Sequence, residues 1–339
     1  MRSTALLAAL LLLPACDDKK SDDKADTAAK GKDADGKDAK AGDDTKDGEK
    51  GKGDPVAGAK AGGGGGDSLK YIPDAATVVF GMDVVAITKN PLWETGKESF
   101  DKDFLEGLEL MKKCEVPLEN WKSMTVGLDP NAKDAVTVVM SATGIGKKTT
   151  IECINKEMTA KDPANEWKLE DDGKKFVSKD ATGFAVNDDL VVMANTGWKD
   201  AAAGLIGGKG ASAADGKLKP LLGRVDQGKT VWVAATIPAE VGGMATAAIG
   251  AAPKDVTATI DLSAGLAVHV EVGVDNAAEA AKKAQTQWDQ AKGMAAGVGV
   301  PQSVTDSVKI ASNDTSITVD ASATADDLKK ISESVKGKL

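Results

Sequence analysis

A long stretch without apolar content limits what this chain can fold. From Asp17 to Asp67 there is no aromatic residue, and Val56 is the only β-branched aliphatic residue. Aspartate, lysine, glycine and alanine dominate, and five consecutive glycines stand at 62–66. Such a segment cannot bury enough apolar surface to offset the entropy lost on ordering. We therefore expect residues 16–67 to be a disordered tether, with a random-coil span of about 40 Å.

The residues before this tether are typical of an export signal. Arg2 precedes an apolar run from Ala5 to Leu13, which is shorter than the roughly 20 residues needed to cross a bilayer. A basic start, a short apolar run and small residues at its end indicate a secretory signal peptide. We predict that residues 1–15 are this peptide.

The residues 13–16, Leu-Pro-Ala-Cys, resemble the lipobox of bacterial lipoproteins. The resemblance covers only residues 1–16, and Pro14 is a less usual residue within such a box. It implies that Cys16 receives a diacylglycerol and becomes the lipidated amino terminus. Two or three acyl chains would hold the protein firmly, since each buried methylene contributes about 0.8 kcal/mol. The alternative is ordinary cleavage near Ala15, which would give a free secreted protein.

The rest of the chain has the size and charge of a soluble, acidic body. Roughly 270 residues follow the tether, enough for one large domain or two smaller ones. The whole chain has a formal net charge of −9 at pH 7, which argues against nucleic acid as a partner. Two cysteines remain, Cys114 and Cys153, and in an exported protein such a pair favours a disulfide. The alternative is two buried free thiols.

Apolar periodicity predicts the same order of elements twice. We expect strands at 77–84, 123–128, 135–141, 167–169, 175–178, 182–186, 190–194, 230–237, 256–262, 266–274, 308–311 and 316–320. We expect helices at 91–114, 149–158, near Trp198, at 239–248, at 276–292, and after residues 324–327, which resemble a capping box.

Both halves of this list have the order β-α-β-β-α-β-β-α, with an additional strand in the first half. The sequence therefore predicts an α+β fold of two tandem modules, 68–210 and 211–339. Each would contain the split βαβ order of ferredoxin-like folds, with an antiparallel sheet and helices on one face. The first two helices of such a module are neighbours, which suits a bridge between Cys114 and Cys153.

Three motifs fail on inspection. Residues 144–149 (GIGKKT) resemble a phosphate-binding loop, but Ser141 stands where that pattern needs glycine, and Lys148 where it needs serine or threonine. A calcium loop centred on Gly36 would have glycines at its first and last ligand positions. His269 is the only histidine, with Glu271 on the same strand face, and is expected at the surface. We therefore predict no cofactor and no metal.

These observations favour a non-enzymatic, lipid-anchored protein of the bacterial cell envelope. It would interact with the membrane through Cys16, and with another envelope component or a surface partner. The overall plan resembles uncharacterised exported lipoproteins of myxobacteria, a resemblance that implies no activity. An alternative is a small-ligand or lipid-binding protein with a groove between the modules, lined by Trp198 and Trp232. A third is an enzyme using paired carboxylates, although only 4% of residues are aromatic, which disfavours a sugar site.

Overall fold

The fold is known from a computed structural model, which describes residues 66–90, 93, 102–163, 166–238, 242–297 and 299–336. The described residues all belong to one compact unit of the chain. Cys16, the predicted signal peptide and nearly all of the predicted tether lie outside them.

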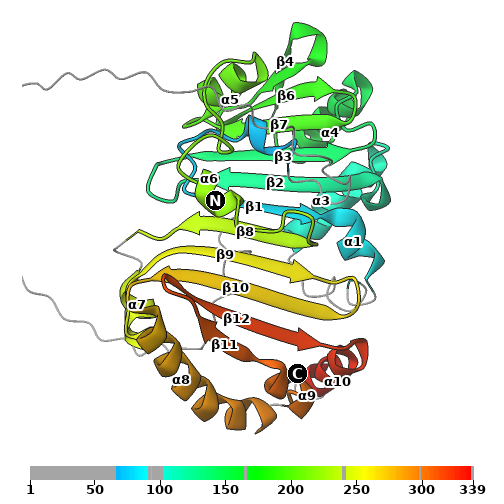
Figure 1. Ribbon diagram of the computed structural model, residues 1–339. Coiled ribbons are helices and arrows are strands. Elements are labelled where there is room, and N and C mark those ends of the chain that lie inside the picture. The colour runs from blue at the N-terminus through cyan, green and yellow to red at the C-terminus, as the bar shows by residue number, and fades with distance from the viewer. Residues whose placement is uncertain are drawn as a thin grey trace, which may run out of the picture. The chain divides into compact units, whose positions relative to one another are not determined.

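Twelve strands of the described residues form one antiparallel sheet (Figure 1). The order across the sheet is β11-β12-β10-β9-β8-β1-β2-β3-β7-β6-β5-β4. In chain order the strands are β1 (Val78–Asp83), β2 (Trp121–Leu128), β3 (Val136–Ala142), β4 (Lys168–Glu170), β5 (Lys175–Val177), β6 (Ala181–Asn187), β7 (Leu190–Asn195), β8 (Val231–Thr236), β9 (Pro253–Asp261), β10 (Leu266–Val274), β11 (Lys309–Ser312) and β12 (Ser316–Ala323).

The α+β class is confirmed, but the prediction of two ferredoxin-like modules is wrong. In a split βαβ unit the first two strands run parallel, with another strand between them. Here β1 pairs directly and antiparallel with β2, and β8 pairs in the same way with β9. Strand β1 also pairs with β8, with Phe80 opposite Val233, so the two halves share one sheet. The boundaries 68–210 and 211–339 stay predictions.

The error has a physical cause. Periodicity shows that helical residues separate two strands, but it does not show whether the chain crosses the sheet before the next strand begins. Because β1 and β2 are antiparallel neighbours, their connection leaves and re-enters at the same end of the sheet, like a wide hairpin. The handedness rule for crossovers applies only to parallel strands, so it gives no guidance here.

The predicted repetition of elements is nevertheless visible in the sheet. Reading outward from the central pair, the N-terminal half (β1 to β7) has the order β1-β2-β3-β7-β6. The C-terminal half (β8 to β12) has the matching order β8-β9-β10-β12-β11. In each half the third strand pairs with the last. Strands β5 and β4 extend only the N-terminal half.

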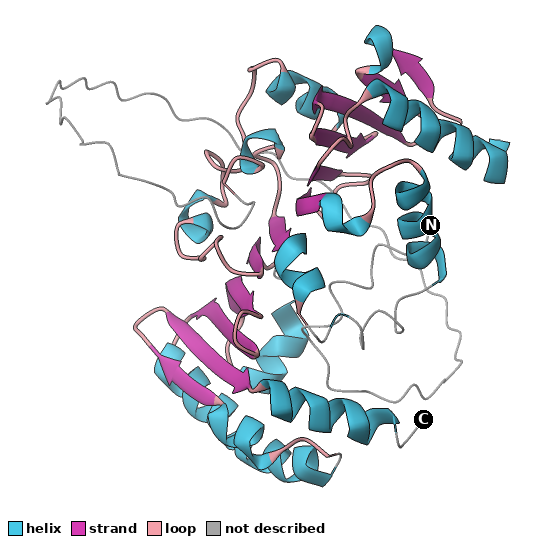
Figure 2. Ribbon diagram, turned by 90° about the vertical axis from the view of Figure 1, so that its right-hand side faces the viewer, coloured by secondary structure: helices cyan, strands magenta, loops and turns pink. Residues whose placement is uncertain are grey.

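Helices cover both faces of the N-terminal half, against the prediction of one face (Figure 2). The helices are α1 (Val84–Lys89), α3 (Lys102–Lys113), α4 (Lys148–Lys161), α5 (Lys199–Ile206), α6 (Lys219–Leu222), α7 (Gly242–Ile249), α8 (Ala277–Gly297), α9 (Gln302–Ser307) and α10 (Ala325–Lys336). Val191 and Val192, consecutive on β7, point into different cores. One core includes residues of α4, and the other includes residues of α5 and α6.

The connection between α5 and β8, residues 207–230, is called the strap below. Its apolar residues join the core on the α5 side of the sheet: Ala213, Leu218, Leu221, Leu222 and Val225. The same core contains Trp232 of β8, which is 1% exposed and lies over Gly81 of β1. A Cβ atom on Gly81 would overlap the indole ring of Trp232, so glycine is required at this close approach.

The C-terminal half buries one face of its strands. A core of Val274, Ala277, Ala280, Ala281 and Ile317 joins this face to α8, and Ile249 of α7 packs against it. The opposite face carries polar side chains, described below as the polar face: Thr257, Thr259, His269, Glu271, Thr318 and Asp320. Such alternation is typical of an antiparallel sheet with one solvated side.

Candidate functional site

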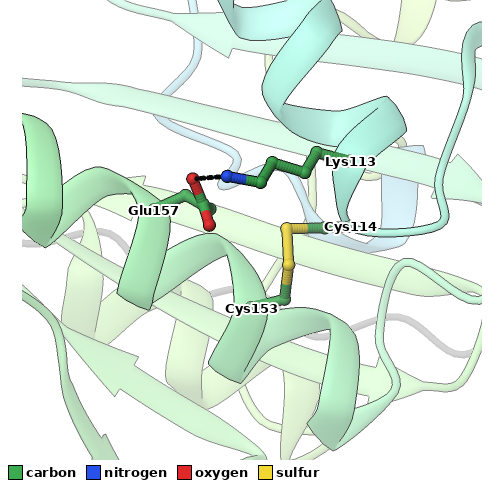
Figure 3. Close-up of a disulfide and its surroundings, with 4 residues drawn as sticks. All are labelled: Lys113, Cys114, Cys153 and Glu157. Atoms are coloured by element: carbon green, nitrogen blue, oxygen red, sulfur yellow. Dashed lines mark hydrogen bonds and ion pairs between the residues drawn. A yellow bond between two sulfur atoms is a disulfide. The ribbon is translucent and has the colours of Figure 1, made fainter.

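The predicted disulfide between Cys114 and Cys153 is present (Figure 3). Cys114 follows the last residue of α3, and Cys153 lies within α4. Their Cα atoms are 5.6 Å apart, within the range that a disulfide spans without backbone movement. Cys114 is 2% exposed, so the bridge lies against the core.

Ion pairs between α3 and α4 accompany this bridge. Lys113 Nζ lies 2.5 Å from a carboxylate oxygen of Glu157, and Lys161 Nζ lies 2.8 Å from Glu106 (Figure 3 shows the first pair). The hydrogen bond and charge of Lys161 lower the pKa of Glu106 below its usual value. Exposed pairs of this kind contribute little stability each. The covalent bond is therefore a stronger tie between these helices than either ion pair.

The glycine-rich turn before α4 is filled by a side chain of the protein itself. The backbone N–H of Gly144 donates to Asp189 Oδ1 at 2.8 Å, and Lys122 Nζ lies 2.9 Å from the same carboxylate. The Gly144 hydrogen bond, followed by the one from Lys122, lowers the pKa of Asp189. The carboxylate of Asp189 thus takes up the N–H of Gly144 in this turn and is paired there with Lys122.

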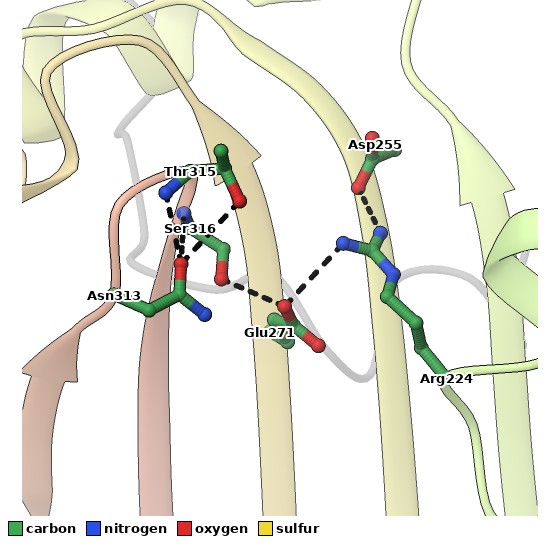
Figure 4. Close-up of polar contacts among 6 residues, drawn as sticks. All are labelled: Arg224, Asp255, Glu271, Asn313, Thr315 and Ser316. Atoms are coloured by element: carbon green, nitrogen blue, oxygen red, sulfur yellow. Dashed lines mark hydrogen bonds and ion pairs between the residues drawn. The ribbon is translucent and has the colours of Figure 1, made fainter.

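The strap is pinned to the sheet by an arginine between two carboxylates (Figure 4). Arg224 follows α6 and donates through one guanidinium nitrogen to Asp255 of β9. Its other terminal nitrogen lies 3.3 Å from Glu271 Oε1 of β10. The Arg224 and Glu271 side chains are 33% and 16% exposed. Gly273 leaves room for the carboxylate of Asp255, because a Cβ atom there would lie 2.6 Å from its Oδ1.

The network continues to the next strand. Ser316 Oγ of β12 donates to Glu271 Oε1 at 2.7 Å. Asn313 Oδ1 accepts from the backbone N–H groups of Thr315 and Ser316, at 2.9 and 2.7 Å, and closes the turn before β12 (Figure 4). The network therefore joins the strap to three strands, and both of its carboxylates are held by a cation or a hydroxyl.

Two further pairs lie at or beside the polar face. His269 Nδ1 lies 2.7 Å from Asp320 Oδ1 on the neighbouring strand, with both side chains about half exposed at 46% and 52%. The surface position predicted for His269 is confirmed, although its contact is with Asp320. Lys229 Nζ lies 2.8 Å from Asp261 Oδ2. That hydrogen bond, followed by those from Ser263, lowers the pKa of Asp261 to about 2.

The groove considered for ligand binding is not formed by the residues predicted to line it. Trp198 and Trp232 are 7% and 1% exposed and belong to the core under the strap. A cavity of about 450 Å³ lies elsewhere, beside α4 and β4, with Glu152, Asn155 and Lys156 among its lining residues. It is shallow and open. The side chain of Asn155 is already engaged, because its Nδ2 donates to the carbonyl oxygen of Trp167 and its Oδ1 accepts from the N–H of Trp167.

The described residues contain no cluster of three or more histidine, cysteine or acidic side chains able to hold a metal ion. Among the helices of the described residues, none is both long and apolar enough to cross a membrane.

Sequence reasoning missed Arg224. One signal could have identified it, because Arg224 is the only arginine besides Arg2 in a chain rich in lysine. A planar guanidinium can hold two carboxylates at once in a way that an ammonium group does not. An isolated arginine among lysines therefore indicates a site that needs such geometry.

Comparisons with known proteins define the fold and nothing finer. No protein-family model and no curated protein matches this chain. Crystal form III of TP0453 is similar over 79% of this chain and 98% of its own, with 11% identity and a TM-score of 0.50. Crystal form I has 11% identity and a TM-score of 0.47 over 80% of this chain and 98% of its own. At this identity the likeness to form III is one of fold alone.

Proposed function

We propose that this chain is a non-enzymatic exported lipoprotein, anchored in the bacterial cell envelope through Cys16. The tether would hold the folded body away from the membrane, where it interacts with another envelope component or a surface partner. The observation that carries this proposal is the lipobox-like Leu-Pro-Ala-Cys at 13–16, directly after the short apolar run.

The disulfide supports an exported location. Disulfides persist in oxidising compartments outside the cytoplasm and are rare inside it. The bridge between Cys114 and Cys153 is therefore in keeping with a body that folds after export.

The polar contacts support an interaction protein over a hydrolase. A nucleophilic triad would have to use His269, the one histidine of the chain, whose imidazole is exposed and paired with Asp320. The carboxylates of Asp255 and Glu271 share one guanidinium, so both serve as ion-pair partners of Arg224. Two carboxylates that are engaged by one cation are not placed as the separate acid and base that carboxylate catalysis needs.

The proposal is tested by separating membranes from soluble proteins in cells that express the full chain. The wild-type protein is expected in the membrane fraction in its processed form. The Cys16→Ser variant is expected either in the soluble fraction or as the precursor with its signal peptide uncleaved. A Cys114→Ser/Cys153→Ser variant is the matched control, because it loses two cysteines but keeps the anchor. A Cys16→Ser protein that is processed normally and stays on the membrane would rule out the anchor.

Protease treatment of intact cells then decides which side of the envelope holds the body. An antibody against the body follows its loss, and a periplasmic marker reports lysis. Loss of the body alone would place its partners outside the cell. Protection would place them in the periplasm, where crosslinking to envelope proteins follows.

A further inference from the structure

The two halves of the sheet match in register as well as in strand order. Phe80 of β1 lies opposite Val126 of β2, and Val233 of β8 lies opposite Ala258 of β9. Phe80 and Val233 also lie opposite one another, where β1 meets β8 at the centre of the sheet (Figure 1). In two copies related by a twofold axis, a residue on the axis faces its own counterpart. The pairing of β1 with β8 has this property.

The strand pairs further from the centre continue the match. Read outward, the paired residues are Phe80, Val126, Val138 and Met193 in the N-terminal half, and Val233, Ala258, Val270 and Val319 in the C-terminal half. The connections between these strands differ in length, since residues 84–120 join β1 to β2 and residues 237–252 join β8 to β9. The common register is therefore not a result of equal loop lengths.

The hairpins β2–β3 and β9–β10 close with the same turn. Asp129 directly follows β2, and Asp261 is the last residue of β9. In each turn Oδ1 of the aspartate accepts from the backbone N–H two residues further on, at 3.0 Å from Asn131 and 2.9 Å from Ser263. Asp129 and Asp261 stand at the same distance along the chain from Val126 and Ala258. The two turns therefore occupy equivalent positions.

Each of these hairpins is also bonded to a threonine that directly precedes the first strand of its half. Thr77 Oγ1 donates to Asp129 Oδ1 at 3.3 Å. Thr230 Oγ1 accepts from the backbone N–H of Leu262 at 3.1 Å. Thr77 and Thr230 are equivalent in the register set by Phe80 and Val233, so the same residue type ties the same two elements in both halves.

The last hairpin repeats as well. Residues 187–188 after the main part of β6 and residues 313–314 after β11 are both Asn-Asp. Asn187 Oδ1 accepts from the backbone N–H of Asp189 at 2.9 Å, and Asn313 Oδ1 accepts from that of Thr315 at 2.9 Å. Met193 and Val319, which are equivalent in the sheet, follow these asparagines by the same number of residues.

We infer that the two halves are copies of one structural unit. Strands β1 and β8 form the surface by which one copy docks on the other, about a twofold axis between Phe80 and Val233. The partner that this strand edge fits is therefore a second copy of the same unit, here supplied by the same chain. Because the copies complete one sheet, the unit differs from the separate ferredoxin-like modules expected from the sequence.

The copies differ on the face that the strap covers in one of them. His269 and Glu271 of β10 stand where β3 has Thr137 and Val139 in the common register. Thr137 and Val139 are buried, whereas His269 is half exposed and Glu271 binds Arg224. Turns and register are thus common to both copies, and the polar face belongs to the second copy alone.

Exchanging the two residues on the axis tests the inference in the full, oxidised chain. Phe80→Val and Val233→Phe each unbalance the pair, and each should raise the unfolding equilibrium constant at least about tenfold. The exchange Phe80→Val/Val233→Phe keeps the volume of the pair, and on a twofold axis the two positions have equivalent surroundings. It should stay within about threefold of wild type. Urea unfolding of the purified proteins measures this.

An exchange away from the axis is the matched control. Val79 and Ala234 face one another and are both fully buried, but the axis does not make their positions equivalent. Val79→Ala/Ala234→Val should therefore remain at least about tenfold less stable than wild type. Full recovery in this control would show that volume alone decides, and would overturn the axis.

Two other results would also overturn the inference. An on-axis exchange that is no more stable than its single variants would show that the two positions are not equivalent. Single variants that unfold like the wild type would show that the pair is not the centre of an interface. If Val233→Phe does not fold, Phe80→Leu/Val233→Leu is compared with Phe80→Leu, and should be the more stable because it places one residue type on both sides of the axis.

Discussion

One row of residues, which runs across all but two strands on a single face of the sheet, shows how the two halves of the molecule differ. In register it runs Phe184, Val192, Val139, Thr125, Gly81, Trp232, Thr259, His269, Asp320 and Lys309. From Val192 to Trp232 the residues are buried, whereas His269, Asp320 and Lys309 are exposed. The face changes from core to polar surface between β8 and β9.

The strap explains where this change occurs. Its leucines lie over the buried part of the face, and Arg224 at its end binds Asp255 and Glu271 at the start of the polar part. In this antiparallel sheet, the character of a face is therefore set by the segment that covers it, and the strands carry matching side chains. The predictions below test this contrast, from the largest expected effect to the smallest.

Truncating a side chain should destabilise the protein most in the part of the face that the strap covers. Trp232→Ala removes a fully buried indole from the junction of the two halves, and is expected to lower the free energy of unfolding by about 3–5 kcal/mol. Urea unfolding followed by circular dichroism measures this. Trp288→Ala, which truncates a half-buried indole on α8, is the matched control and should cost clearly less. Equal losses in the two variants would remove the contrast.

Arg224 should stabilise the boundary between the buried and the polar part of the face. Arg224→Ala leaves two partly buried carboxylates without their cation and frees the end of the strap, with an expected cost of about 1–2 kcal/mol. Arg224→Lys should recover part of this, because an ammonium group keeps the charge but not the forked geometry. Thermal unfolding compares the three proteins. If both variants unfold like the wild type, the strap is not pinned by this contact.

Acid should weaken the pairing of Asp261 with Lys229. The folded pKa of Asp261 lies at about 2, below its ordinary value of 3.8. The pairing therefore stabilises the protein fully above pH 4, and this stability is lost as the pH falls from about 4 to 2. Allowing for partial exposure, we expect about 1 kcal/mol.

The measurement is the difference in unfolding free energy between wild type and Asp261→Asn. It should be constant between pH 5 and 7 and shrink towards pH 2. A difference that does not change with pH would show that the pairing contributes no pH-dependent stability.

The exposed end of the row, at His269 and Asp320, should tolerate substitution with little loss of stability. His269→Ala removes one half-exposed contact with Asp320, and the free energy of unfolding should move by less than about 0.5 kcal/mol. Chemical denaturation checks this. A loss above about 1.5 kcal/mol would mean that His269 supports more of the fold than its exposure indicates.

Local patterns predicted the elements well and their assembly poorly. The capping box at 324–327 is present, with Thr324 Oγ1 accepting from the N–H of Asp327 at 3.2 Å, because its chemistry is complete within four residues. The pairing of β1 with β8 joins residues such as Phe80 and Val233 that are far apart in the sequence. Periodicity fixes which face of a strand is apolar but carries no information about which strand lies beside it.

The candidate site shows the same division. The disulfide could be predicted from the cysteine count and the expected export, although the ferredoxin-like layout used to support it is wrong. It forms because α3 and α4 are neighbours on one face of the sheet. The strap could not be predicted, since α6 is a single short turn of helix without a periodic pattern, and the partners of Arg224 lie on β9 and β10.

The central claim is that the mature protein begins at a lipidated Cys16, and mass spectrometry of its N-terminal peptide tests this most directly. The protein is purified from membranes and digested, and its first peptide is identified. We predict a peptide that starts at Cys16 and carries a diacylglyceryl thioether. A mature terminus elsewhere, or an unmodified Cys16 thiol, would contradict the account.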